Sequence, residues 1–266
     1  MSAVPLSQAD DPQRFGGKAH GLARALNAGL PVPPGLAVAH DVLRAVVDDQ
    51  RSLLEFAEQI AQLLPGPVAV RSSAVGEDAG DASFAGQHLT RLNAEGAGAI
   101  AEALAQVWQS GHRDSARAYR ERLGLGREVQ MGVVVQQLVP AEVAGVMFTR
   151  NPLTRADERV IEAARGLGEV VVQGLITPDY YRVARNGETL EVRRGNQDLL
   201  IRPLAQGGTE ELECEPPSSA LLDQRWLEVL NRLATDVESA FAGALDIEWA
   251  LAGEAVFLLQ VRSLTA

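Results

Sequence analysis

Apolar residues along this chain follow two spacings, one that favours helices and one that favours strands. Helical spacing predicts helices over residues 17–28, 41–47, 52–64, 98–123 and 221–241. Short apolar or alternating runs predict strands over residues 68–70, 133–139, 144–149, 159–163, 180–184, 188–193 and 199–202. Residues 74–88, rich in Gly, Ala and Asp, are expected to form a loop, and residues 203–218 are expected to form an acidic linker. Helices and short antiparallel strands alternate without a strict βαβ rhythm, which favours an α+β fold.

The last segment predicts a hairpin, with arms over residues 245–251 and 255–262 and a turn at 252–254. Because successive side chains of a strand point to opposite faces, Asp246 and Glu248 share one face of the first arm. Gln260 and Arg262 share one face of the second arm for the same reason. Carboxylate and amide oxygens suit Mg²⁺, and a guanidinium suits phosphate. An ordinary hairpin with one solvated polar face is the alternative interpretation.

Composition excludes some classes of function but does not identify the function of the chain. The chain has 266 residues, is 46% hydrophobic and carries a net charge of −11, with 35 acidic and 24 basic residues. That charge argues against non-specific binding to nucleic acid or to an anionic membrane, although a nucleotide site needs only local cations. The one cysteine, Cys214, excludes a disulfide within the chain and a cysteine-cluster metal site. No apolar run is long enough to span a membrane, and the polar N-terminus is no signal peptide, so a cytoplasmic location is expected.

Two segments place a cation where a phosphate could bind. Gly16-Gly17-Lys18 begins a predicted helix, where backbone N–H groups and a lysine favour an anion, although the spacing is not that of a Walker loop. Arg71 ends the strand before Ser72 and Ser73. Taken singly, a surface lysine and a structural strand-end arginine are the commoner interpretations. The four histidines, at positions 20, 40, 88 and 112, have no metal-ligand spacing, and the serines have no evident base partner.

Taken together, these segments resemble a known family. The chain is similar to the N-terminal nucleotide-binding (ATP-grasp) domain shared by phosphoenolpyruvate synthase, pyruvate phosphate dikinase and rifampicin phosphotransferase. The matching blocks, in family order, are FGGKAHGLARALNAGLPVPPG (15–35), VAVRSSAVGEDAGDASFAGQH (68–88), VVVQQLVPAEVAGVMFTRNP (133–152), VIEAARGLGEVVVQG (160–174), TPDYY (177–181), LDIEWAL (245–251) and VFLLQVRSLT (256–265).

The resemblance implies roles for individual residues. Lys18 matches a lysine that contacts ATP phosphates, and Arg71 matches an arginine that stabilises the transferred phosphoryl groups. Adenine binding is implied near Gln136. The remaining implied residues bind nucleotide or metal, with Gly86 and Thr90 in a phosphate-covering loop, Glu248 and Gln260 as metal and phosphate ligands, and Arg262 as a phosphate-binding arginine. Phosphoryl transfer depends mainly on positioning, Mg²⁺ and cations, in agreement with this set.

The resemblance predicts a two-lobed ATP-grasp fold, with an N-terminal lobe over residues 1–137, a C-terminal lobe over 138–266 and Mg-ATP bound between them. It implies an ATP-dependent, dikinase-type phosphotransferase that cleaves ATP to AMP and passes a phosphoryl or pyrophosphoryl group to a histidine supplied by another domain or chain. Two departures are Ala19, where the family usually has glycine, and a short segment between residues 47 and 68. A stand-alone small-molecule kinase and a non-catalytic nucleotide-binding regulator remain the alternatives.

Overall fold

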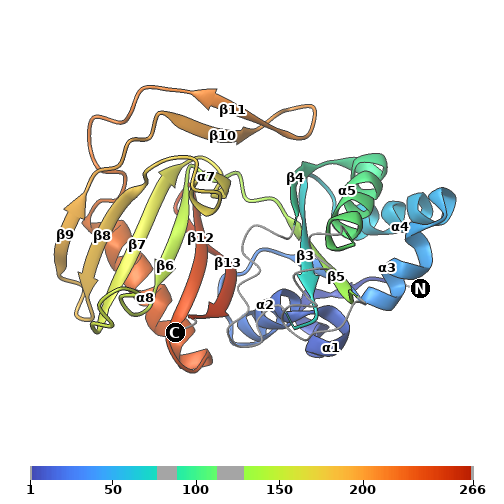
Figure 1. Ribbon diagram of the computed structural model, residues 1–266, viewed down its shortest axis with the longest axis horizontal. Coiled ribbons are helices and arrows are strands. Elements are labelled where there is room, and N and C mark those ends of the chain that lie inside the picture. The colour runs from blue at the N-terminus through green and yellow to red at the C-terminus, as the bar shows by residue number, and fades with distance from the viewer. Residues whose placement is uncertain (1, 77–88, 113–128, 265–266) are drawn as a thin grey trace.

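The computed structural model describes residues 2–76, 89–112 and 129–264. It consists of two lobes, each built on an antiparallel sheet (Figure 1). The N-terminal sheet has the strand order β1-β2-β5-β3-β4. Its strands are β1 (Val4–Pro5), β2 (Gly35–Val38), β3 (Val68–Ala74), β4 (Thr90–Ala94) and β5 (Met131–Gln137).

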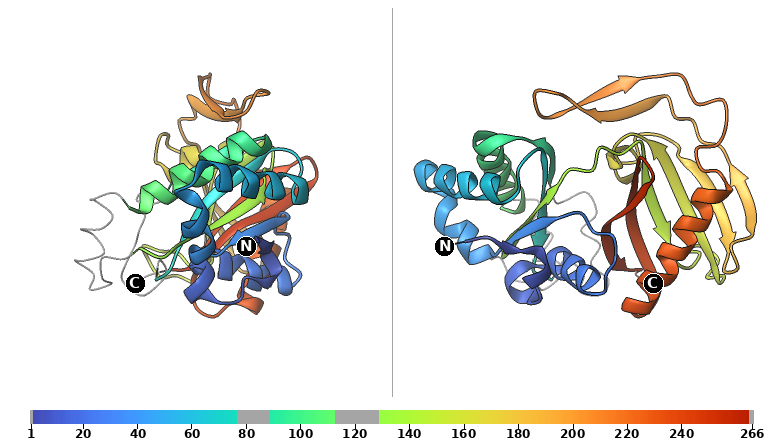
Figure 2. Two further views of the ribbon diagram at one scale, coloured as in Figure 1. Left: turned by 90° about the vertical axis from the view of Figure 1, so that its right-hand side faces the viewer. Right: turned by 180° about the vertical axis from the view of Figure 1, so that it is seen from behind.

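Helices cover both faces of the N-terminal sheet (Figure 2). On one face, α3 (His40–Val47) and α5 (Gly96–Gly111) pack against the central strands, and α4 (Gln50–Leu63) packs on both helices. The short η1 (Leu6–Gln8), α1 (Pro12–Phe15) and α2 (Gly17–Asn27) form a second group near β2, β3 and β5. Strands β3 and β5 are almost wholly buried, because helices lie on both sides of them.

The C-terminal sheet has the strand order β13-β12-β6-β7-β8-β9. Its strands are β6 (Val143–Phe148), β7 (Glu158–Arg165), β8 (Asp179–Ala184), β9 (Thr189–Arg193), β12 (Leu245–Ala252) and β13 (Ala255–Ser263). Helix α8 (Gln224–Ala240) crosses one face and buries an apolar stripe that includes Leu230, Ala234 and Val237 (Figure 2). Its N-terminus is capped by Asp223, which accepts the Trp226 N–H at 3.0 Å. The other face of the sheet is free of α8 and carries the polar residues of the final hairpin.

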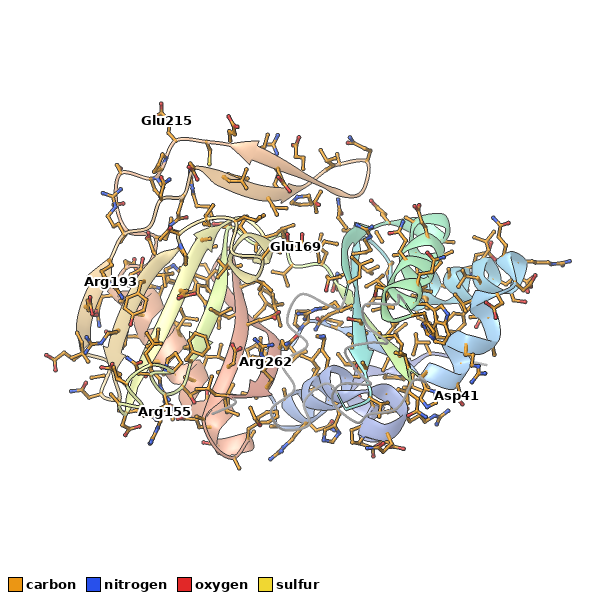
Figure 3. All side chains as sticks on the ribbon, viewed as in Figure 1. Asp41, Arg155, Glu169, Arg193, Glu215 and Arg262 are labelled. Atoms are coloured by element: carbon orange, nitrogen blue, oxygen red, sulfur yellow. The ribbon has the colours of Figure 1, made fainter. Side chains whose placement is uncertain are left out.

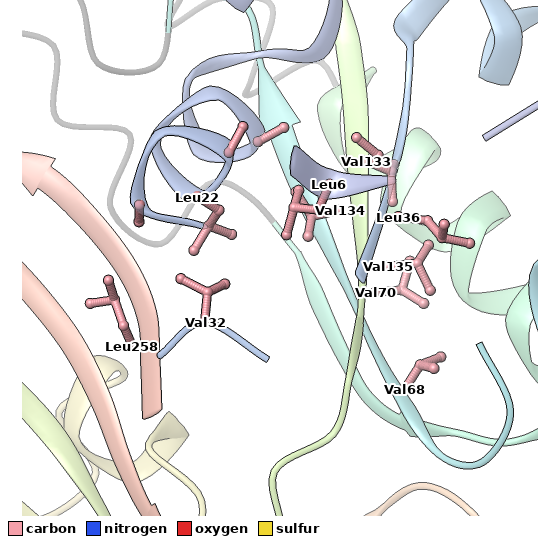
Figure 4. Packing of buried hydrophobic residues seen from close by; sticks show 14 of the residues in the cluster. Leu6, Leu22, Val32, Leu36, Val68, Val70, Val133, Val134, Val135 and Leu258 are labelled. Atoms are coloured by element: carbon pink, nitrogen blue, oxygen red, sulfur yellow. The ribbon is translucent and has the colours of Figure 1, made fainter. Parts of the chain in front are cut away.

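The two lobes are linked by a connecting segment and also pack against each other through one hydrophobic core. The connection follows β5, and residues 138–142 lead into β6. Leu258 of β13 lies beside Leu22 and Val32 of the N-terminal lobe (Figure 4), and all three belong to one buried cluster. The Leu258 N–H also donates to the Pro31 carbonyl at 2.9 Å. The end of the chain is therefore packed directly against its beginning.

The α+β class and the two-lobed arrangement expected from the sequence are confirmed. Several details differ from the expectation. The prediction of an acidic linker over residues 203–218 was wrong in part. Residues 209–213 form β11, which pairs with β10 (Leu199–Pro203) in a separate two-stranded ribbon. A one-turn helix, α7 (Glu169–Val172), follows the predicted turn at Gly166. Strands β1, β2 and β4 lie where no strand was expected. The expected helix over 98–123 is α5 as far as Gly111, and its last part lies outside the described residues.

Candidate functional site

The final hairpin places its polar residues in directly opposed pairs. Glu248 of β12 lies opposite Gln260 of β13, and Asp246 lies opposite Arg262. Leu245, Ile247, Trp249 and Leu251 alternate with the two acids and point the other way, into the core under α8. The strand period thus produces a polar patch on the α8-free face, because each buried apolar residue fixes the direction of its neighbour.

Arg71 joins this patch from the other lobe. Its guanidinium donates to the Glu248 carboxylate at 2.5 Å, to the Gln260 Oε1 at 3.2 Å and to the Leu259 carbonyl. The Arg71 side chain is 10% exposed and that of Glu248 is 19% exposed. A pair this deeply buried is held by its full set of hydrogen bonds, since desolvation offsets much of the charge attraction. Arg71 is therefore a residue of the N-terminal sheet whose guanidinium is bonded to the final hairpin of the other lobe. The expected strand end at Arg71 was wrong, because β3 continues through Ser72 and Ser73 to Ala74, paired with β5.

Lys18 approaches the same strand from helix α2. Its ammonium group donates to the Ser72 carbonyl at 2.8 Å, and the Ala19 N–H donates to the Ser73 hydroxyl at 3.0 Å. Gly16 precedes the helix with φ +82°, and a Cβ at this position would lie 2.0 Å from the Ser73 carbonyl oxygen. Only glycine permits this close approach. The predicted glycine loop is thus fixed against β3, one residue from Arg71.

Carboxylates on the α8-free face carry shifted pKa values. Burial raises the pKa of Asp246, and the charge of Arg262, which donates to it at 2.7 Å, opposes that shift. Burial and the charge of Asp246 also raise the pKa of Glu162 in β7. Glu162 and Glu248 both pair with Val146 of β6, on its two sides, so they occupy one row across the sheet. Figure 3 shows Arg262 on the side of the C-terminal lobe that faces the N-terminal lobe.

The other predicted residues are placed as follows. Thr90 lies directly opposite Arg71 in the pairing of β4 with β3. Gln136 is buried in β5, on the sheet face that Arg71 also occupies, and its side-chain amide donates to the Pro33 carbonyl at 3.1 Å. Gly86 lies outside the described residues. The structure thus brings Lys18, Arg71, Thr90, Glu248, Gln260 and the Asp246–Arg262 pair to one boundary between the lobes, with Gln136 farther along β5.

Sequence reasoning missed two residues of this region. Ser73 holds the start of α2 through its hydroxyl, and Glu162 extends the acidic row. Glu162 alternates with buried Ile161 and Ala163, so its strand period alone could have assigned it to the polar face.

The donor set fits a divalent cation that is also held by phosphate. Among residues 2–76, 89–112 and 129–264, no group of three or more histidine, cysteine or acidic side chains is placed to hold a metal. Mg²⁺ commonly takes one or two protein oxygens and completes its shell with water and substrate phosphates. Glu248 and Gln260 offer two such oxygens, and both already converge on a cation, the Arg71 guanidinium.

A separate cavity of about 680 Å³ lies elsewhere in the C-terminal lobe. Its lining is formed by Thr149, Arg150, Arg155, Arg185, Glu238, Gly243 and Ala244. This lining includes none of the predicted site residues that the structure describes. The charges of Arg185 and Glu238 are already paired across it at 2.6 Å. The inter-lobe boundary is therefore the better candidate for the chemistry.

Comparisons with known proteins identify the family of the chain. Residues 50–266 match the family model described as pyruvate phosphate dikinase, AMP/ATP-binding domain. The chain is 39% identical over 203 residues to a probable phosphoenolpyruvate synthase of Archaeoglobus fulgidus, covering 74% of this chain and 27% of the relative. It is 34% identical over 233 residues to a rifampicin phosphotransferase of Bacillus subtilis, covering 86% and 26% respectively. The chain thus spans about a quarter of the length of these relatives.

Among solved structures, the crystal structure of PH1788 from Pyrococcus horikoshii superimposes with a TM-score of 0.51 at 13% identity, over 97% of this chain and 94% of the other. At that identity the likeness concerns the fold alone. No helix in the described part of the chain has the length and apolar character needed to cross a membrane. The match of the family model over more than half of the sequence settles the classification. The chain belongs to the pyruvate phosphate dikinase AMP/ATP-binding domain family.

Proposed function

We propose that this protein binds Mg-ATP between its lobes and performs the ATP-using half of a dikinase-type phosphotransfer. In this reaction ATP is cleaved to AMP, and a phosphoryl or pyrophosphoryl group passes to a histidine of another domain or chain. The observation that carries the proposal is the convergence of Arg71, from one lobe, on Glu248 and Gln260 of the other. A cytoplasmic location, where ATP is available, is part of the same proposal.

The proposed roles follow from charge and position. Lys18 and Arg71 bind the phosphates from the N-terminal side, and Arg262 binds them from the C-terminal side. Glu248 and Gln260 hold Mg²⁺, which when bound neutralises phosphate charge and orients the phosphates. The adenine lies near Gln136 and the residues that follow it. Gly86 and Thr90 contact the phosphates in this proposal, with Thr90 as the first residue of β4 rather than part of a loop.

Arg71 has to change partners for this function. Its guanidinium lies against the same oxygens that would bind the metal. When Mg-ATP enters, the phosphates supply new acceptors for the guanidinium, and Glu248 becomes available as a metal ligand. The exchange costs little, because each charge keeps an opposite charge beside it. Arg71 then lies where it can stabilise the charge that develops during transfer.

AMP production tests the proposed reaction. The purified chain, supplied with Mg-ATP, should form little AMP alone and should form up to one AMP per carrier histidine when a purified histidine-carrier domain of the family is added, because the transferred group stays on the histidine. Chromatographic separation of AMP and ADP provides the readout. Rapid AMP formation without a carrier would contradict the need for a separate histidine. ADP formation with a small molecule would instead support the stand-alone kinase.

A further inference from the structure

A further contact between the lobes lies away from both the Arg71 pairs and the packing of Leu258 against the N-terminal lobe. The β10–β11 ribbon leaves the C-terminal lobe and reaches across to β4 of the N-terminal lobe (Figure 1). Its base is fixed to the C-terminal lobe, where the Leu167 N–H donates to the Ile201 carbonyl at 2.9 Å. Its tip, residues 204–208, turns through Gly207 and Gly208, which have φ of +93° and +73°. Glycine is the residue that adopts two such conformations in succession at little cost.

Asn93 holds this tip with three hydrogen bonds. Its side-chain amide donates to the Leu204 carbonyl at 2.7 Å and to the Gly208 carbonyl at 2.6 Å. Its own carbonyl accepts the Gly208 N–H at 2.9 Å. The residue lies at an irregularity in the pairing of β4 with β3, has φ +59° and is 4% exposed. Asparagine is among the few non-glycine residues that tolerate this left-handed conformation. We call Asn93 together with residues 204–208 the clasp.

An apolar contact lies beside the clasp. Leu92 of β4 packs against a small buried cluster of the C-terminal lobe, formed by Ala164, Leu167, Val170 and Ile201. Because Leu92 and Asn93 are adjacent, one segment of β4 makes both a polar and an apolar contact with the other lobe. Both contacts therefore join the lobes rather than the strands of one sheet.

The clasp acts on the strand that faces Arg71. Thr90 pairs with Arg71, and Asn93 follows three residues later in the chain. The β3–β4 pair of the N-terminal lobe thus contacts the C-terminal lobe at two places. Arg71 makes the contact near one end of the pair, and Asn93 makes it near the other. Separation of the lobes around the connecting residues 138–142 requires that both contacts break.

We propose that Asn93 is a positioning residue: the clasp holds the two lobes at the separation that Mg-ATP requires, and its opening sets the rate of nucleotide release. This inference rests on the proposed function for the nucleotide, but the clasp itself stands on the described contacts alone. An amide at position 93 is required, since its NH₂ group donates to both carbonyls while the backbone keeps φ > 0.

Two substitutions at position 93 separate the role of the left-handed backbone from that of the side-chain amide. Asn93→Gly keeps the left-handed backbone and removes the side chain. Asn93→Asp keeps the shape but offers only acceptors to the two carbonyls. Asn186→Asp is the matched control, because the Asn186 Oδ1 accepts the exposed Glu188 N–H at 3.0 Å, a role that a carboxylate oxygen can take over. Leu92→Ala tests the neighbouring apolar contact.

Stopped-flow release of a fluorescent ATP analogue, chased by excess Mg-ATP, measures the effect. Loss of the two part-buried hydrogen bonds of the Asn93 amide should raise the release rate about tenfold in Asn93→Gly and Asn93→Asp. Leu92→Ala should raise it less, and Asn186→Asp should leave it unchanged. A release rate within twofold of wild type in both Asn93 variants would overturn the proposal. A slower rate would overturn it as well.

Small-angle scattering of the nucleotide-free chain separates this test from that of the proposed function. Both Asn93 variants should show a larger radius of gyration than wild type and Asn186→Asp, with unchanged helix content by circular dichroism. If the wild-type chain bound no nucleotide, the proposed function would be wrong, and scattering alone would decide the clasp. An unchanged radius of gyration in both variants would then overturn it.

Discussion

Removal of the Arg71 guanidinium should have opposite effects on stability and on metal binding. In Arg71→Ala, the Glu248 carboxylate, whose side chain is 19% exposed in wild type, loses its charge partner. Breaking one side of a buried pair typically costs about 3–5 kcal/mol. Because Glu248 can regain some water, we expect a loss near the lower limit, about 3 kcal/mol. A further Glu248→Gln change should restore about 2 kcal/mol, since it removes the unpaired charge.

Urea unfolding with and without Mg²⁺ measures both effects. In the absence of nucleotide, Mg²⁺ should stabilise Arg71→Ala more than wild type, because the metal no longer competes with the guanidinium for Glu248 and Gln260. AMP formation with a carrier domain should fall about 10²-fold, the typical cost of a lost transition-state cation. Arg202→Ala, which removes an exposed arginine of the ribbon, is the control. Full turnover in Arg71→Ala, or equal stabilisation of both proteins by Mg²⁺, would be incompatible with these roles of Arg71.

Two further predictions concern the loop and the acidic row. Gly16→Ala should lower the free energy of unfolding by about 2 kcal/mol or more, because backbone strain at positive φ is added to a steric clash. The added methyl group clashes with the Ser73 carbonyl oxygen. Gly98→Ala is the control and should be neutral or slightly stabilising, because Gly98 in α5 has open space around it. Equal urea midpoints for the two variants would contradict the predicted strain at Gly16. Glu162→Gln should stabilise the protein at pH 7, because burial raises the pKa of Glu162 in the folded state. The Glu162 carboxyl binds its proton more tightly in the folded protein than in the unfolded chain. The protein therefore loses stability as the pH rises from the pKa of Glu162 in the unfolded chain to its higher pKa in the folded protein. The gain from Glu162→Gln should therefore shrink at pH 4, and a gain independent of pH would exclude this cause.

Much of the fold was predictable because its elements have strong local patterns. The alternation of Leu245, Ile247 and Trp249 with Asp246 and Glu248 is enough by itself to assign the polar face of the hairpin. The β10–β11 ribbon was harder, because residues 209–213 carry three glutamates and bury no continuous face. A ribbon that stands off the main sheet needs no apolar alternation, so its second strand resembles a linker.

The contacts across the lobes could not be predicted from local pattern. Arg71 and Glu248 are 177 residues apart, and only the packing of two separate sheets brings them together. The resemblance to a family assigned both residues to one site but gave no indication that they pair with each other. Asn93 carried no signal either, because a single left-handed residue in a short strand leaves no trace in hydrophobic spacing.

Calorimetric titration of Mg-ATP into the chain is the direct test of a nucleotide site between the lobes. We expect one Mg-ATP per chain, with binding that requires Mg²⁺ and is weakened at least tenfold by Glu248→Ala. Glu191→Ala, which removes an acid that pairs with Arg182 in the outer strands, should bind like wild type. Absence of binding at millimolar nucleotide with Mg²⁺, or equal affinity in wild type and Glu248→Ala, would show that the site lies elsewhere or does not exist.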